Sequence, residues 1–146
     1  MTRITESRIE ELLDGPHQGV LSVSQTNKGP VAVPMSYLFQ NGWFYMVTST
    51  ESLHGRLMSR TGRATMTVQF EACDGRRLHQ WYVMAEGPIG FTDLAPEPLV
   101  RTIVAKDRGE EHADEWMAGD SSPEVQVAVL QPEKLSGYEF RESLDD

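Results

Sequence analysis

The residues best suited to chemistry lie together in one short stretch, TSTESLHGR, which begins at Thr48 and ends at Arg56. If Ser52 caps a helix there, its side chain accepts a hydrogen bond from a backbone N–H group two or three residues later. The N–H groups that follow then point outward with the positive end of the helix dipole and can bind an anion. Hydroxyl donors at Thr48 and Ser49, with positive charge at His54 or Arg56, would complete a phosphate cradle. Serine and threonine are also the usual helix caps, so an ordinary strand-to-helix corner is the alternative.

The elements around this stretch are predicted to place it between the end of a strand and the start of a helix. The apolar residues 43–47 predict a strand, and residues 57–60 continue as a helix. Asn41-Gly42 is the strongest hairpin signal in the chain, because both turn positions favour a positive φ. Strands expected over residues 20–24, 31–39 and 43–47 therefore form a three-stranded antiparallel meander.

The rest of the chain is predicted to be mostly strands joined by turns and short helices. Asn27-Lys28-Gly29 and Asp74-Gly75 have the composition of turns. Thr5 is expected to cap the first helix, and a long strand is expected to bend near Gly87-Pro88. The further strands are expected over residues 63–70, 78–89, 125–130 and 135–140, and the further helices over residues 5–13, 95–106 and 110–117.

The predicted fold class is mainly β, of the α+β kind. About seven antiparallel strands in a chain of 146 residues favour a barrel, since closure removes exposed strand edges. No linker or repeat divides the chain, so residues 1–146 are expected to form a single domain. The absence of β-α-β alternation argues against a parallel sheet. The sequence also contains no glycine-rich phosphate loop.

Composition and charge exclude several classes of partner. The net charge of −9 argues against nucleic acid and against anionic membrane surfaces, since both require a basic face. The apolar runs are too short to span a bilayer, and the N-terminus has no signal-peptide core, so a cytoplasmic location is expected. Cys73 is the only cysteine, so no internal disulfide can form. His17, His79 and His112 lack the spacing of metal ligands, and no metal site is predicted.

Three segments taken together are similar to a known family. They are GVLSVSQTNKGPVAVPMSYLF, NGWFYMVTSTES and GRLMSRTGRATMTV. In this order and spacing they resemble the first hairpin, the third strand with its hydroxyl-rich exit, and the short helix with its return strand in the flavin-binding split β-barrel family. The best-known member of that family is pyridoxamine 5′-phosphate oxidase. The resemblance covers residues 19–70 most clearly, and it implies an antiparallel split barrel of Greek-key type.

The resemblance also implies a homodimer with two flavin mononucleotide (FMN) sites in clefts between the subunits. The residues expected beside the flavin ring lie on the second hairpin strand and at the end of the next strand: Ala32, Val33, Pro34, Met35, Ser36, Tyr37, Val47 and Thr48. The residues expected around the phosphate lie in the hydroxyl-rich exit and the helix start: Ser49, Ser52, Leu53, His54 and Arg56.

The sequence departs from the family pattern in two places. The basic pair that follows the phosphate-binding serine in the family is replaced by Leu53 and His54. Histidine is mostly neutral near pH 7 unless a phosphate raises its pKa, so less charge is available, and Arg56 is the residue that could compensate. The C-terminus also lacks the tryptophan and arginine that pyridoxamine phosphate oxidase uses for its substrate. Oxidation of vitamin B6 is therefore not predicted.

The function favoured by these observations is an FMN-dependent oxidoreductase or reductase acting on a small molecule. The flavin ring would carry the hydride chemistry and the protein would supply position, hydrogen bonds and a dry cleft, so no side chain is assigned as catalytic. Two alternatives stay open. One is a deazaflavin-dependent reductase, and the other is a flavin-binding or stress-related dimeric barrel without turnover. The substrate and the electron donor do not follow from the sequence.

Overall fold

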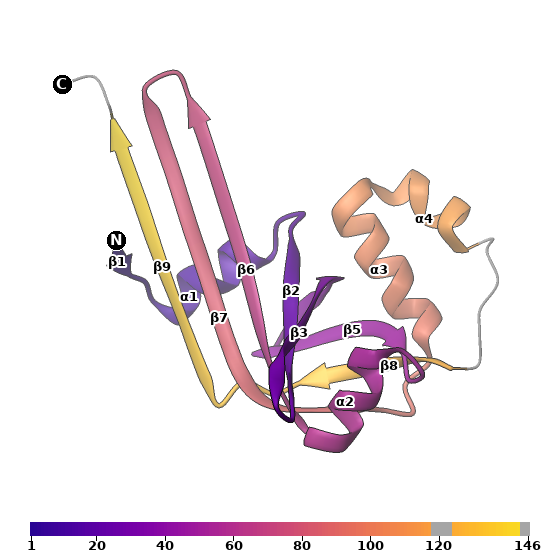
Figure 1. Cartoon of the computed structure of the whole chain (residues 1–146). Coiled ribbons are helices and arrows are strands. Elements are labelled where there is room, and N and C mark those ends of the chain that lie inside the picture. Colours follow the sequence, from indigo (N-terminus) through magenta and orange to yellow (C-terminus); the bar gives the residue numbers. More distant parts are fainter. Residues whose placement is uncertain (118–123, 144–146) are drawn as a thin grey trace.

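The structure is a computed structural model that describes residues 1–117 and 124–143, shown in Figure 1. The described strands are β1 (Thr2–Arg3), β2 (Gln18–Gln25), β3 (Lys28–Ser36), β4 (Leu38–Gln40), β5 (Trp43–Ser49), β6 (Arg63–Asp74), β7 (Arg77–Phe91), β8 (Val125–Leu130) and β9 (Lys134–Ser143). The helices are α1 (Glu6–Leu13), α2 (Leu53–Thr61), α3 (Pro96–Arg108) and α4 (Glu110–Met117). Within the described ranges, no helix combines the length and the apolar content needed to cross a bilayer.

All strands pair antiparallel, in the order β3-β2-β6-β7-β8-β5-β4, and β9 pairs with both β7 and β1. The predicted mainly β fold with a few short helices is therefore confirmed. The short strand β1 was not predicted, because two residues are too few to show a period.

The strand predicted over residues 31–39 is wrong in one respect, because two strands occupy this segment. β3 pairs with β2 as far as Ser36, and β4 pairs with β5 from Leu38 onward, so the chain changes partner at Tyr37. The Tyr37 side chain is fully buried, and its hydroxyl donates a hydrogen bond to the Leu13 carbonyl at 3.0 Å. The predicted antiparallel pairings of consecutive segments are both present, but two strands divide them, since β3 pairs with β2 and β4 pairs with β5.

Strand β7 joins the two parts of the sheet. It pairs with β9 as far as Glu86 and with β6 as far as Pro88, and then with β8 from Ile89, so the bend expected near Gly87-Pro88 falls where the strand changes partners. A Cβ atom at Gly87 would meet the backbone oxygen of Gln131, which explains why a glycine stands at this crossing. In Figure 1, β6, β7 and β9 form one long arm, and α3 with α4 lies beside the shorter strands.

The sheet is split and does not close into a continuous barrel. Among the described strands, β3 pairs only with β2 and β4 pairs only with β5, so each keeps an unpaired edge. The closed barrel expected from the number of strands is therefore not formed by the strands that the structure describes. An open edge of this kind exposes backbone N–H and C=O groups that can pair with a ligand or with another chain.

The core lies between the sheet and its helices. Its largest fully buried side chains include Leu21 on β2, Phe44 and Met46 on β5 and Met66 on β6. Burial of each such side chain stabilises the fold by about 1.5–3 kcal/mol. The helix α1 adds Ile9, Leu12 and Leu13 to this core, and Thr5 caps it as predicted, with its side chain accepting from the Arg8 N–H at 3.2 Å.

One predicted hairpin turn is confirmed, and the other is shifted by one residue along the chain. Asn41 and Gly42 both adopt positive φ, at 54° and 85°, as the hairpin signal requires. The first hairpin turns one residue earlier than expected, at Thr26 and Asn27, and Lys28 already belongs to β3. Asn27 takes the left-handed conformation there, with φ 58°, and Gly29, two residues later, does not.

Candidate functional site

The corner between β5 and α2 is built around Ser52. This residue is the N-cap of α2, as predicted, with φ −65° and ψ 161°. Its Oγ accepts a hydrogen bond from the Gly55 N–H at 3.1 Å and donates one to the Ser49 carbonyl at 2.8 Å. The serine thus joins the helix start to the end of the strand and holds the corner in one conformation.

Gly55 allows the helix to approach the strand end closely. A Cβ atom at this position would collide with the carbonyl oxygen of Ser49 and would lie 3.0 Å from Ser52 Oγ. Any other residue would therefore push the first turn of α2 away from β5. The glycine in TSTESLHGR is explained by this packing and not by its φ angle.

Two backbone donors remain free at the helix start. The first N–H groups of a helix have no partner within the helix, and Ser52 satisfies only that of Gly55. The N–H groups of Leu53 and His54 have no acceptor among the described residues. They occupy the positive end of the α2 dipole, which is the arrangement that binds phosphate in proteins. The donor set of this corner therefore fits a phosphate group.

His54 is directed toward the strand end and not toward open solvent. Its Nε2 lies 2.6 Å from Thr48 Oγ1 and 3.3 Å from Ser52 Oγ. Burial lowers the pKa of His54 below its usual value, so the imidazole is neutral at pH 7. His54 therefore offers hydrogen bonding to a ligand but no permanent charge, unlike the lysine that it replaces in the family pattern.

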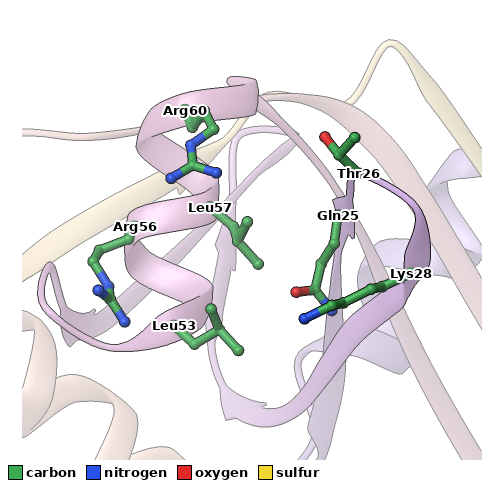
Figure 2. A pocket seen from close by; sticks show the side chains of 7 residues that line it. All are labelled: Gln25, Thr26, Lys28, Leu53, Arg56, Leu57 and Arg60. Carbon is green, nitrogen blue, oxygen red and sulfur yellow. The ribbon is translucent and has the colours of Figure 1, made fainter.

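Arg56 does not join His54 at the corner. Two residues correspond to about half a turn of helix, so Arg56 projects from a different face of α2. It lines a pocket between α2 and the β2–β3 turn, as Figure 2 shows. Lys28 and Arg60 line the same pocket, and neither was predicted as a site residue. The spacing of Arg56 and Arg60 by four residues was visible in the sequence, but the position of Lys28 follows only from the packing of the hairpin against α2.

Residues 32–37, which are expected beside a flavin ring, fall into two groups along β3 and at Tyr37 directly after it. Ala32 and Pro34 are exposed and Ser36 is partly exposed, so these side chains can meet a ligand. Their neighbours Val33, Met35 and Tyr37 alternate with them and pack against or within the core, where they support the strand.

Val47 and Thr48 stand near the end of β5, as expected. They pair with Val127 and Gln126 of β8, and both are partly buried. The hydroxyl of Ser49 accepts a hydrogen bond from the Glu51 N–H at 3.1 Å, so it shapes the turn. Among the side chains that the structure describes, which leave out residues 114–123 and 144–146, no group of histidine, cysteine, aspartate and glutamate is arranged to hold a metal ion.

Three features define a split-barrel protein with a polar strand-to-helix site. They are the open edge of β3, the strand β7 that joins the two parts of the sheet, and the capped corner at α2. A family model for pyridoxamine 5′-phosphate oxidase matches residues 5–138. The chain therefore belongs to the pyridoxamine 5′-phosphate oxidase family, as the resemblance in its first half indicated. No curated protein matches the sequence.

Solved structures share the fold at low sequence identity. An FAD-binding protein from Mesorhizobium loti is 18% identical, with a TM-score of 0.70 over 95% of this chain and 97% of that one. An FAD-binding protein from Mycobacterium smegmatis is 15% identical, with a TM-score of 0.59 over 96% of this chain and 100% of that one. The haem storage protein HutZ from Vibrio cholerae is 15% identical, with a TM-score of 0.61 over 89% and 92%. These likenesses establish the fold, and the proteins that share it are named for FAD binding in two cases and for haem storage in the third.

Proposed function

We propose that this protein binds a flavin nucleotide, with the flavin phosphate at the corner of β5 and α2, and acts as a flavin-dependent oxidoreductase. The observation that carries the proposal is the pair of free N–H groups of Leu53 and His54 beside Ser52 and Thr48. Membership of the pyridoxamine 5′-phosphate oxidase family and the FAD-binding proteins of the same fold support it.

The residues of the chain have distinct tasks in this proposal. The Leu53 and His54 N–H groups hold the phosphate, and Ser52 keeps them in place. His54 contributes a neutral ring hydrogen-bonded to Thr48, so the affinity relies on backbone donors more than on side-chain charge. The exposed side chains of β3 and its unpaired backbone edge face the ring, and the bound flavin supplies hydride transfer.

The test compares riboflavin, which has no phosphate, with FMN. Each is titrated into the purified protein by quenching of flavin fluorescence, and flavin bands in the visible absorbance of the protein as isolated are recorded first. We expect FMN to bind at least about tenfold more tightly, because a charge-assisted hydrogen bond contributes about 1.5–3 kcal/mol. Equal affinities for the two compounds would mean that the corner does not recognise phosphate.

Variants at the corner sharpen this test. His54→Ala is expected to reduce the preference for FMN over riboflavin several-fold, because the ring that offers a hydrogen bond beside the free N–H groups is lost. Ser59→Ala is the matched control: this exposed serine lies on the same helix, and its Oγ donates only to the Gly55 carbonyl at 3.2 Å. If His54→Ala leaves FMN affinity untouched, the assignment of the phosphate to this corner is wrong.

We also propose that the active form is a homodimer with cofactor sites at the subunit interface. Val20 and Met84 are 41% and 44% exposed, and both align with Thr67 in one row across β2, β6 and β7. Pro34 on β3 extends this row to the open edge of the sheet. Light scattering after size exclusion is expected to give twice the chain mass, and Val20→Lys is expected to lower it. A monomer at all concentrations would refute the proposal.

Measurements of catalytic turnover and of cofactor affinity distinguish the flavin-dependent oxidoreductase from its two alternatives, a flavin-binding barrel without turnover and a deazaflavin-dependent reductase. Protein loaded with flavin is expected to oxidise NADH or NADPH in the presence of an electron acceptor. Protein that binds flavin tightly but oxidises neither nucleotide would be a flavin-binding barrel without turnover. Tighter binding of a deazaflavin cofactor than of FMN, measured in parallel, would favour the deazaflavin-dependent reductase.

A further inference from the structure

The pocket between α2 and the β2–β3 turn has a volume of about 270 Å³ and is lined by three cations, Lys28, Arg56 and Arg60 (Figure 2). The remaining lining residues come from the same two elements and are polar or apolar, and none of them carries a negative charge. Leu53 and Leu57 project toward Gln25 and Lys28 across the pocket in Figure 2, so the hairpin and the helix form its opposite walls. We call this the Lys28–Arg60 pocket.

The three cations lack the ion pairs that other basic residues of this protein form. Arg8 and Arg63 each bond two carboxylates, at distances between 2.7 and 3.3 Å. Lys28, Arg56 and Arg60 form no salt bridge with any described residue, although the chain carries 22 acidic and only 13 basic side chains. All three side chains are exposed, and an anionic ligand in the pocket they line would meet three positive charges and no negative one.

The Lys28–Arg60 pocket adjoins the phosphate corner. Leu53 and Arg56 line the pocket and belong to the first turn of α2, whose free N–H groups form the corner. The first turn of α2 thus contributes to both positive regions, to the corner through its free N–H groups and to the pocket through Arg56. A nucleotide with a single phosphate can neutralise one of them, whereas two linked phosphates can reach both.

We propose that the Lys28–Arg60 pocket binds the second phosphate of a flavin dinucleotide, so that this protein prefers FAD to FMN. The inference rests on the proposed function, because it takes the first phosphate to lie at the corner. Arginine binds phosphate through paired hydrogen bonds and lysine binds it as a point charge. A volume of about 270 Å³ suits a phosphate with its linking atoms and is small for a whole nucleoside, so the adenosine is expected to lie at the surface.

The experiment titrates FMN and FAD separately into the protein freed of flavin, at fixed ionic strength. We expect FAD to bind at least about tenfold more tightly than FMN to the unchanged protein. The double variant Lys28→Gln, Arg60→Gln is expected to lose about tenfold or more in FAD affinity and less than about twofold in FMN affinity. Arg77→Gln, an exposed residue at the start of β7, makes the same kind of charge change elsewhere and is expected to alter neither.

The outcomes separate this inference from the proposed function. Equal affinities for FMN and FAD, or an FAD preference that survives in the double variant, would overturn the inference and leave flavin binding at the corner intact. Failure to bind either flavin would overturn the proposed function, and the inference would fall with it. Loss of FMN and FAD affinity by the same factor in the double variant would also overturn the inference, since it would mean that these cations serve the first phosphate.

Discussion

Replacing Glu139 with glutamine tests how the first helix is fastened to the sheet. Glu139 lies on β9 and receives two hydrogen bonds from Arg8 of α1, from Nε to Oε1 at 2.9 Å and from Nη2 to Oε2 at 2.7 Å. His79 Nε2 lies 2.8 Å from the same Oε2. These contacts, the Arg8 hydrogen bonds above all, lower the pKa of Glu139 from 4.5 to about 2.

The size of the effect follows from this pKa. A difference of about 2.5 pH units corresponds to at most about 3.4 kcal/mol, at 1.36 kcal/mol per unit. Solvent screens the pair, because the Arg8 side chain is 32% exposed, so we expect about 1–2 kcal/mol at pH 7. A carboxylate whose pKa is lowered by folding stabilises the protein above pH 4.5, and this stabilisation is lost as the pH falls from 4.5 to about 2.

The assay is urea unfolding of the unchanged protein and of Glu139→Gln, at pH 7 and at steps down to pH 2. We expect the variant to be less stable at pH 7 and the difference in unfolding free energy to shrink toward zero near pH 2. Glu71→Gln, an exposed carboxyl on β6, is the control and should stay within about 0.5 kcal/mol. A difference that is the same at pH 7 and pH 2 would refute the assignment to an ion pair.

Three further substitutions test single features of the fold, each by urea unfolding. Gly55→Ala is expected to destabilise the protein by about 1–3 kcal/mol, because the new Cβ would collide with the backbone of Ser49. Gly29→Ala is the control, and it should change stability by less than about 0.5 kcal/mol because no atom lies near its Cβ position. Equal effects of the two substitutions would contradict the packing argument. Gly42→Ala should cost about 1–2 kcal/mol because φ there is 85°, and an unchanged stability would mean that the turn differs. Tyr37→Phe should cost about 1–2 kcal/mol by leaving the buried Leu13 carbonyl without its donor, and an unchanged stability would contradict the role of this hydrogen bond.

Local chemistry made several elements of the fold predictable. Thr5 and Ser52 cap their helices through their own side chains, and Asn41-Gly42 turns because both residues tolerate positive φ. These outcomes depend on residues close together in the chain, so short patterns record them. The division of residues 31–39 at Tyr37 was not predictable in this way, because both sides of the break have the composition of a strand.

The candidate site was predictable in part for the same reason. The corner at Ser52 is local, and its hydroxyls and glycine appear as one motif. The direction of His54 depends on where β5 ends relative to α2, and the nearness of Lys28 to Arg60 depends on how a hairpin packs against a helix more than 20 residues later. The spacing of residues along the chain carries no record of such contacts.

The sequence by itself determined most of the strands, the caps at Thr5 and Ser52, the Asn41-Gly42 turn and the hydroxyl-rich corner before α2, because each arises from backbone preferences over a few residues. Only the tertiary structure decided that the sheet stays open at β3, that His54 is neutral and turned inward, and that Arg56 faces a separate basic pocket. Burial and the meeting of distant segments set these properties, and neither exists until the chain has folded.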